Sequence, residues 1–284
     1  MIIDFHTHIF PEAIRVNRER YFPSEPAFKL LYNSTESKLS GVKNIIDTMD
    51  EQGVDISVIF GFPWETADTF KMHNDYIIDA VVRYPKRLVG LGCFDLLTPG
   101  AQSEAERCIE NGLSGIGELA FYQSIMDDTI LTRLEPIMAI LRNKNLPILI
   151  HTNEPIGHPY FGKADMTIRQ IDNLVSRFPN NTIVLAHWGG GLFYFYLLKK
   201  QIKEHLTNVY FDTAASPFLY DSKIYPVAVE ILGPQKILFG SDYPLLNPQR
   251  YFNEIRSTGL SKDDIQCICG LNAARLLKLD RVHS

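Results

Sequence analysis

Two histidines near the start of the chain carry the clearest chemical signal. His6 and His8 stand one residue apart at the end of the largely apolar run 1–5. Because side chains alternate between the two faces of a strand, both imidazoles point to the same side, one pleat apart. Imidazoles that converge in this way bind zinc and other borderline divalent metals when further histidines and carboxylates join them. The pair therefore predicts a metal site whose other ligands come from elsewhere in the chain.

Four later apolar runs end in a residue that can bind a metal. These runs cover 115–118, 146–151, 182–187 and 236–242, and they end at Glu118, His151, His187 and Asp242. Runs that are apolar on both faces are typical of parallel strands buried between helices, and the carboxyl ends of such strands form the functional rim of an α/β fold. The pattern favours one metal site built from the ends of five strands.

The elements that must position these residues alternate regularly between strand and helix. Expected strands cover 2–7, 55–61, 87–93, 113–119, 146–151, 182–187, 207–213 and 236–242. Segments with helical periodicity lie between them, near 42–52, 68–84, 101–111, 129–144, 166–178, 192–205 and 221–232, and more follow the last strand. This alternation predicts an α/β fold, a (β/α)8 or TIM barrel, in which residues 1–284 form a single domain.

Two connections are longer than a strand–helix turn requires. The segments 9–41, after the first strand, and 152–165, after the fifth, are rich in aromatic residues and proline. Both leave from the catalytic rim, so we expect them to cover the barrel mouth and shape a pocket. Trp64, Trp188 and His158 are the candidates for substrate contact. His73 falls in the helical segment 68–84 and is expected in the outer ring of helices.

The composition narrows the possible partners and the location. The chain has 28 basic and 33 acidic residues, and the resulting net charge of -5 argues against nucleic acid as a partner. The first residues already read as a strand, so we expect no secretory leader, and no apolar stretch reaches the about 18 residues that would span a membrane. Four cysteines without a CxxC pair are typical of free thiols in a reducing compartment. We therefore expect a cytoplasmic protein that acts on a small molecule.

Taken together, the motifs resemble the amidohydrolase superfamily of metal-dependent barrels. The resemblance is to its amidohydrolase-related branch, which includes aminocarboxymuconate-semialdehyde decarboxylase and the resorcylate decarboxylases. It rests on the segments 3–11, 177–179, 186–190, 239–244 and 270–277. HxH, the two later histidines and the GSDxP motif occur in order and at barrel spacing, so the resemblance covers essentially the whole chain.

The resemblance implies a set of roles for the strand-end residues. It implies that His6, His8, His151 and Asp242 bind a catalytic divalent metal, with zinc expected, and that His187 acts beside it in acid–base chemistry or substrate polarisation. Where superfamily hydrolases with two metals carry a carboxylated lysine, this chain has Glu118, which is similar to the strand-4 glutamate of TatD-like nucleases. One or two metals per chain, and direct ligation by Glu118 and His187, stay open. Family habit favours a homodimer.

Three functions are compatible with this set of residues. The first expectation is a metal-dependent hydrolase of a small-molecule amide, lactone or ester-like bond, in which Asp242 takes a proton from a metal-activated water and His187 stabilises the oxyanion. The alternative is a non-oxidative decarboxylase, a carboxy-lyase, of a small aromatic or unsaturated acid. The third is a metal-stabilised binding protein without catalysis. Glu118 favours hydrolysis, and the sequence does not identify the substrate.

Overall fold

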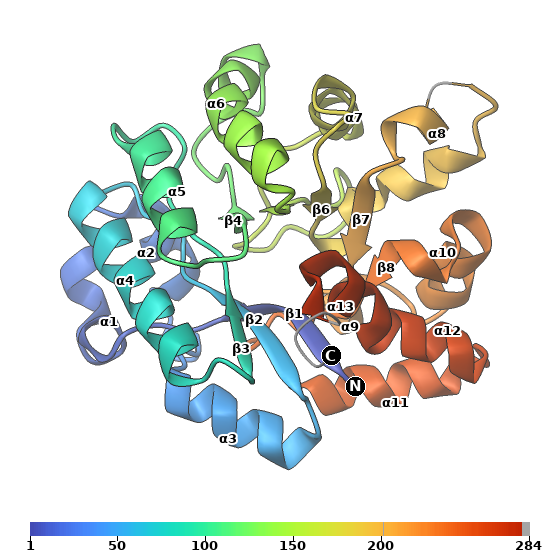
Figure 1. Cartoon of the computed structure of the whole chain (residues 1–284), viewed down its shortest axis with the longest axis horizontal. Helices are drawn as coiled ribbons and strands as arrows, with labels where there is room; N and C mark the ends of the chain where they lie inside the picture. Colours follow the sequence, from blue (N-terminus) through green and yellow to red (C-terminus); the bar gives the residue numbers. More distant parts are fainter. Residues whose placement is uncertain (201, 280–284) are drawn as a thin grey trace.

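The computed structural model describes residues 1–200 and 202–279, and it places parallel strands inside a ring of helices (Figure 1). The strands are β1 (Ile3–His8), β2 (Ile56–Phe60), β3 (Leu88–Gly90), β4 (Ile116–Leu119), β5 (Ile148–Ile150), β6 (Ile183–Leu185), β7 (Val209–Asp212) and β8 (Ile237–Leu238). They pair in chain order, with β1–β2–β3 in one sheet and β4–β5–β6–β7–β8 in the other. β1 extends one residue past the segment expected from the sequence, and the other seven strands lie inside their expected segments.

Backbone hydrogen bonds close the two sheets into a barrel. Between β3 and β4, the amide of Gly117 donates to the carbonyl of Gly92 at 2.8 Å. Between β8 and β1, the amide of Asp242 donates to the carbonyl of His6 at 2.9 Å. The second junction brings the last candidate ligand directly beside the first. The TIM barrel predicted from the alternation of strands and helices is confirmed.

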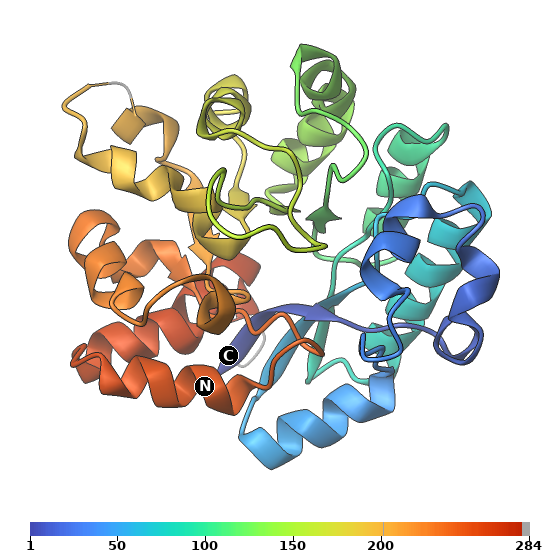
Figure 2. The same cartoon turned by 180° about the vertical axis from the view of Figure 1, so that it is seen from behind.

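The helices lie outside the strands, as Figures 1 and 2 show from opposite sides. Those in the connections between strands and directly after β8 are α3 (Val42–Gln52), α4 (Ala67–Arg83), α5 (Ala101–Glu110), α6 (Asp128–Lys144), α7 (Ile168–Arg177), α8 (Ile202–His205), α10 (Ile224–Leu232) and α11 (Pro248–Ser257). Shorter turns are α9 (Ser216–Leu219) and η3 (Pro234–Lys236) before β8, and α12 (Lys262–Gln266), η4 (Cys267–Leu271) and α13 (Asn272–Leu277) at the end.

Apolar residues pack on both faces of the strands. In β5, Ile148 and Ile150 belong to the large cluster that includes the helices, whereas Leu149 belongs to a second cluster with Val58 and Val184. Since neighbouring strand residues point to opposite faces, the second cluster fills the barrel interior. Polar side chains are therefore concentrated where this interior packing ends, at the carboxyl ends of the strands.

The two long connections expected after strands 1 and 5 are present. The first folds into α1 (Glu12–Val16), η1 (Arg18–Tyr21) and α2 (Pro26–Tyr32), which we call the lid. Its Phe28 ring lies 4.5 Å from the Trp64 ring, which anchors the lid to the loop after β2. The second connection runs from His151 to the start of α7. Figure 2 shows it crossing the open end of the barrel.

One expected helix is wrong over most of its length. In place of a helix at 192–205, the chain forms the 3₁₀-helical segment η2 (His187–Leu197), and the four-residue helix α8 follows it. The backbone is left-handed from Trp188 to Gly191, with φ between 59° and 91°. Three consecutive glycines permit this conformation at low cost, and it directs the chain away from a helix immediately after β6.

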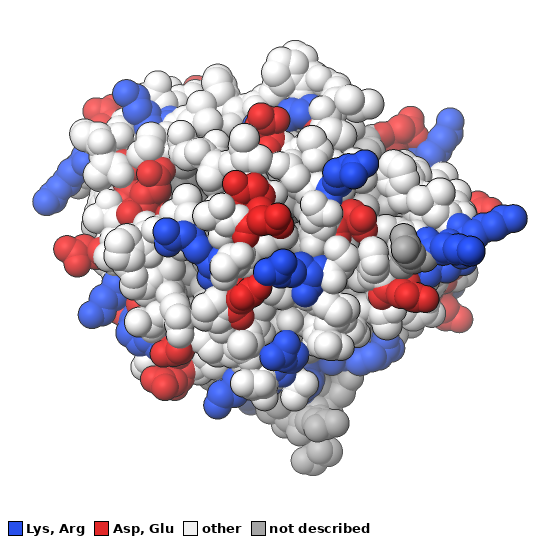
Figure 3. All heavy atoms as spheres, turned by 90° about the horizontal axis from the view of Figure 1, so that it is seen from above, with Lys and Arg blue, Asp and Glu red and all other residues white. Residues whose placement is uncertain are grey.

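The remaining whole-chain expectations stay predictions. Among the residues that the structure describes, no helix has the length and apolar character needed to cross a membrane. On the face shown in Figure 3, basic and acidic side chains are interspersed. A single domain, a homodimer, a cytoplasmic location and the absence of a nucleic-acid partner are not tested by these observations.

Candidate metal centre

Six side chains with metal-binding atoms meet at the carboxyl ends of the strands. They come from β1, β4 and the residues just after β5, β6 and β8, and they are His6, His8, Glu118, His151, His187 and Asp242. Three overlapping groups of three have ligand atoms within 4.8 Å of one another. The structure thus brings together every side chain that the sequence placed at a metal-bearing strand end.

Glu118 lies at the centre of this cluster and faces four imidazoles. Its Oε2 lies 3.6 Å from Nε2 of His6 and 3.7 Å from Nε2 of His8. Its Oε1 lies 3.0 Å from Nδ1 of His151 and 3.5 Å from Nε2 of His187. Ligand atoms bound to one ion at about 2.1 Å lie roughly 3.0–3.5 Å apart, so this spacing is close to that of donors around a cation.

Asp242 and His187 reach the cluster from strained backbone. Both have positive φ, 59° for Asp242 and 53° for His187, a conformation that non-glycine residues seldom adopt. Asp242 thereby places its Oδ1 3.5 Å from Nε2 of His8. Strain of this kind is found where surrounding structure holds a residue in a functional position. The His8 ring in turn packs edge-on against the Phe60 ring at 4.7 Å.

Each imidazole is held by the nitrogen that points away from the cluster. The contacts are His6 Nδ1 to Asp212 Oδ2 at 2.8 Å, His8 Nδ1 to the Gly61 carbonyl at 2.9 Å, His151 Nε2 to the Gly162 carbonyl at 3.0 Å, and His187 Nδ1 to the Ala214 carbonyl at 3.0 Å. Carbonyls and carboxylates only accept, so these nitrogens carry protons, and the opposite nitrogen of each ring faces the cluster.

This hydrogen bonding fits a divalent cation. Within the described chain, the buried Nε2 of His6 has no hydrogen-bond partner. Metal-binding histidines have their outer N–H held by a carbonyl or carboxylate, which fixes the tautomer and the direction of the other nitrogen. The donor set of imidazoles and carboxylates suits zinc, manganese or iron.

Charges within the cluster shift its titration strongly. Burial raises the pKa of Glu118, but His6 and His151 lower it more, so the pKa lies well below its usual range. Burial lowers the pKa of His187, but Glu118 raises it more, to about 9. Burial also lowers the pKa of His6, but the charges of Glu118 and Asp212 raise it more, so this pKa lies well above its usual range. Without metal, protons on imidazoles therefore neutralise the carboxylates, and a cation must displace them.

The three residues expected to contact substrate differ in their surroundings. Trp64 and Trp188 have no exposed surface. The Trp64 indole donates to Nδ1 of His73 at 2.8 Å, and the Trp188 indole donates to the Ser216 hydroxyl at 2.7 Å. Each indole is enclosed and hydrogen-bonded within the fold, and contact of either one with substrate stays a prediction. His158 is exposed in the loop after β5.

Two tyrosines beside the cluster, Tyr122 and Tyr32, were not predicted as site residues from the sequence. The Tyr122 ring lies 5.1 Å from the His151 ring and is nearly parallel to the Phe62 ring at 6.2 Å. Tyr32, at the end of the lid, packs edge-on to Phe62 at 5.9 Å. Burial first, and then the site carboxylates, raises the pKa of both phenols, so both stay protonated donors. Aromatic residues in loops are too common for sequence to single these out.

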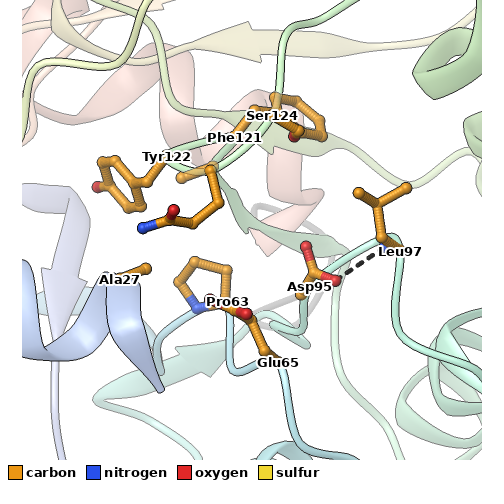
Figure 4. Close-up of a pocket in the computed structure, with 10 residues that line it drawn as sticks. Ala27, Pro63, Glu65, Asp95, Leu97, Phe121, Tyr122 and Ser124 are labelled. Atoms are coloured by element: carbon orange, nitrogen blue, oxygen red, sulfur yellow. Dashed lines mark hydrogen bonds between the residues drawn. The ribbon is translucent and has the colours of Figure 1, made fainter. Parts of the chain in front are cut away.

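A small cavity adjoins this aromatic group. The cavity has a volume of about 120 Å³. Residues of the loops that follow β2, β3 and β4 line it (Figure 4). Its lining residues are Ala27, Pro63, Glu65, Asp95, Leu97 and residues 120–124. Tyr122 belongs to this lining and also packs on His151, so it connects the cavity with the cluster.

Asp212, at the end of β7, was also missed. Its Oδ2 accepts from His6, while its Oδ1 accepts from the backbone amides of His187 at 2.9 Å and Ala214 at 3.0 Å. A signal for it existed, since the run 207–213 contains an aspartate at the strand end like the runs that supply ligands.

Comparison with known proteins gives a consistent set of relatives. A family model described as Amidohydrolase matches residues 3–279. The 2-amino-3-carboxymuconate-6-semialdehyde decarboxylase of Dictyostelium discoideum is 25% identical over 98% of this chain and 92% of its own length. A gamma-resorcylate decarboxylase of Rhodococcus jostii is 24% identical over 75% of this chain and 78% of its own length.

Solved structures share the fold. A 5-carboxyvanillate decarboxylase from Sphingomonas paucimobilis has a TM-score of 0.74 and 20% identity, with 98% of each chain covered. A dihydroxybenzoic acid decarboxylase from a Polaromonas species, with bound manganese and the inhibitor 2-nitroresorcinol, has a TM-score of 0.71 and 19% identity, with 99% of this chain and 97% of that chain covered.

These relatives correct the first functional expectation. The expectation of a hydrolase for amide, lactone or ester-like bonds is wrong, because the curated relatives are decarboxylases and align over most of their length. The physical reason is that the same metal ligands and acid–base groups can serve either reaction. Glu118 at strand 4 therefore does not determine which bond breaks.

Proposed function

The chain belongs to the amidohydrolase family, and from this premise we propose that it is a metal-dependent decarboxylase of a small aromatic or unsaturated carboxylic acid. The reaction class is supported by the decarboxylases among its curated relatives. The substrate class is supported by the aromatic rings of Tyr32, Phe62 and Tyr122, which form one wall beside the cluster.

The proposed metal ligands are His6, His8, Glu118, His151 and Asp242, which would hold one divalent cation. Manganese in the Polaromonas neighbour supports manganese as a candidate beside zinc. When bound, the cation would polarise the substrate carboxylate or a neighbouring oxygen and offset its charge.

The observation that carries the proposal is the placement of His187. Its Nδ1–H donates to the Ala214 carbonyl, which aims Nε2 into the cluster, 3.5 Å from Glu118. A proton held on Nε2 can pass to the substrate carbon that bears the carboxylate. The bond between this carbon and the carboxylate then breaks, carbon dioxide leaves, and its electron pair returns to the substrate π system. Solvent returns a proton to His187, so the net change is one proton taken up and one carbon dioxide released.

Tyr122 and Tyr32 would complete substrate binding. Their rings flank Phe62, and burial together with the charges of Glu118 and Asp242 raises the pKa of both phenols, which keeps them protonated. A phenol hydroxyl can donate to a carboxylate or hydroxyl oxygen of a flat acid, while the half-buried ring of Tyr122 can pack against the ring of that acid. Recognition of this kind requires no lysine or arginine.

The reaction can be tested directly in deuterated water. Protein loaded with Mn²⁺ or Zn²⁺ is incubated with 2,6-dihydroxybenzoate, 5-carboxyvanillate and a set of unsaturated acids, and carbon dioxide is measured. We expect release from at least one acid, with a single deuterium at the carbon that loses the carboxylate. His187→Gln should lower turnover by roughly 100-fold or more, in the range usual for loss of a general acid.

His205→Gln is the matched control, because His205 lies on α8 and contacts Asp172 at the surface. Its turnover should equal that of the unmodified protein. Fully metal-loaded protein that releases no carbon dioxide from any of these acids would contradict the proposed function.

A further inference from the structure

A buried pair of side chains lies behind the metal ligand His8 and takes no part in the proposed reaction. His73, on α4, is 1% exposed, and Trp64, in the loop after β2, is fully buried. His73 was expected in the outer ring of helices. It does lie on an outer helix, but on the face that packs against the ends of β1 and β2.

The hydrogen bonds of His73 fix its tautomer. The Trp64 indole N–H can only donate, and it lies 2.8 Å from Nδ1 of His73, so Nδ1 is the acceptor. The proton is therefore on Nε2, which donates to the Ile9 carbonyl at 2.7 Å. Both ring nitrogens are used, and the imidazole is neutral. Since Ile9 directly follows His8, this side of the ring holds the backbone at the end of β1.

The other contact of His73 holds the His8 side chain. The ring packs directly on Gly61, where an added Cβ would lie 2.8 Å from the His73 Nδ1 and 2.9 Å from its Cε1. The Gly61 carbonyl accepts the hydrogen bond from His8 Nδ1. His73 therefore supports the very carbonyl that directs the His8 Nε2 lone pair toward Glu118 and Asp242.

The same pair packs against the lid and the residues that lead into it. The ring of Phe10, just before the lid, lies 5.2 Å from the His73 ring. The lid rings of Phe28 and Tyr21 lie 4.5 Å and 5.8 Å from the Trp64 ring. The lid and the residues that hold His8 thus both pack against the same buried pair, His73 and Trp64. A shift of this pair would move the lid and His8 together.

We propose that His73, with Trp64, is a positioning residue that holds His8 in the orientation that binds a divalent cation and joins it to the lid. The inference rests on the proposed function only in taking His8 as a metal ligand. Removal of an outer hydrogen-bond partner of a metal-binding histidine usually weakens metal affinity about 10–100-fold. His73 acts one step further out, through Gly61 and Ile9, and we expect an effect near the lower end of that range.

The test compares two substitutions of His73. His73→Phe keeps a ring but loses both hydrogen bonds, whereas the amide of His73→Gln can accept from Trp64 and donate to Ile9. Metal-free protein is titrated with Mn²⁺ by calorimetry, and unfolding in urea is measured separately. We expect the Kd for Mn²⁺ to rise roughly tenfold in His73→Phe and to return most of the way in His73→Gln.

Leu134→Ala separates positioning from general loss of stability. Leu134 is a fully buried residue of α6, and its truncation should cost about 2–5 kcal/mol of unfolding free energy. Because Leu134 lies on α6, and not on α4 or in the loop after β2, its Kd for Mn²⁺ should stay within about twofold of that of the unmodified protein. A wild-type Kd in His73→Phe, together with lowered stability, would overturn the proposal.

Gly61→Ala provides an independent test of the packing. The added methyl group must displace the His73 ring, so we expect a rise in Kd similar to that of His73→Phe. In the double variant Gly61→Ala with His73→Ala, the methyl group enters the space that the ring leaves. Its Kd should therefore be no higher than that of His73→Ala alone, and additive losses would overturn the proposal. The readout involves no turnover, so failure here and failure of the decarboxylation test are separate results.

Discussion

At the scale of single residues, Asp212 joins two histidines of the cluster. One carboxylate oxygen accepts from the His6 ring, and the other accepts from the backbone amide of His187. Asp212 is fully buried, as is His6. A buried N–H left without an acceptor costs about 1–3 kcal/mol, so Asp212 stabilises both the tautomer of His6 and the turn that carries His187.

Asp212→Asn should therefore weaken metal binding. The amide keeps the size of the carboxylate but offers a single acceptor, so the His6 N–H and the backbone amides cannot all be satisfied. We expect the Kd for Mn²⁺ to rise roughly 10–100-fold in a titration of the metal-free protein. Asp172→Asn is the control, because it removes a carboxylate 3.0 Å from Nδ1 of a histidine, His205, at the surface. Equal affinities of the two variants would contradict this role of Asp212.

Local geometry at single residues could be predicted from the sequence, whereas their long-range partners could not. His6 and His8 could be placed on one face because a strand imposes that alternation within three residues. The partner of the His6 ring, Asp212, lies 206 residues away. Its place at the end of the run 207–213 could have marked it as a candidate site residue, but no local pattern pairs it with His6. Trp64 and Trp188 were expected to contact substrate because they follow strand ends. Their burial depends on hydrogen-bond partners, His73 and Ser216, that only the folded chain brings to them.

At the scale of elements, the loops after β5 and β6 lock together. Gly190 lies in the left-handed turn after His187, with φ of 59°. A Cβ at this position would overlap the carbonyl oxygen of Asn153, two residues after His151. The glycine is therefore required twice, for its backbone conformation and for the close approach of two loops that each carry a candidate ligand.

Comparison of Gly190→Ala with Gly53→Ala can separate these two requirements. Gly53, which ends α3, has φ of 70° and an open space with nothing within 4 Å of an added Cβ. Both alanines bear the left-handed penalty of about 1–2 kcal/mol, but only Gly190→Ala also forces the loops apart. In urea unfolding we expect Gly190→Ala to lose at least about 2 kcal/mol more than Gly53→Ala, as overpacked sites do. Similar losses would show that the loops are not held by this contact.

The barrel elements were largely predictable, and the exceptions have a physical cause. Strands such as β5 and β6 are buried between the helices and the barrel interior, so they are apolar on both faces and can be recognised as short apolar runs in the sequence. The segment 192–205 also has helical periodicity, but the left-handed turn at Gly189–Gly191 shortens the helix that follows. Periodicity likewise placed His73 on a helix, but it could not show that the end of β1 lies against that face.

At the scale of the whole molecule, the cluster spans both sheets of the barrel. His6 and His8 belong to the sheet of β1, β2 and β3, whereas Glu118 lies on β4 in the other sheet and His187 follows β6. The sheets meet at isolated bridges, Thr7 with Tyr243 and Gly92 with Ile116. A cation bound by ligands from both sheets would therefore add a cross-link beside one of the two junctions that close the barrel.

Metal removal should accordingly lower the stability of the entire barrel. A cation that binds only the folded chain stabilises it by about 2.7 kcal/mol when its free concentration is 100 times Kd. For a chain of 284 residues, with an unfolding entropy of about 2.1 cal/mol/K per residue, that corresponds to a rise in melting temperature of roughly 4–5 °C. The measurement is differential scanning calorimetry with Mn²⁺ and then with a chelator. His8→Asn should show little or no such difference, because it lacks a ligand from the first sheet. If His8→Asn showed the same metal-dependent rise, the cation would bind elsewhere; if the unmodified protein showed none, the two sheets would not be joined through the cluster.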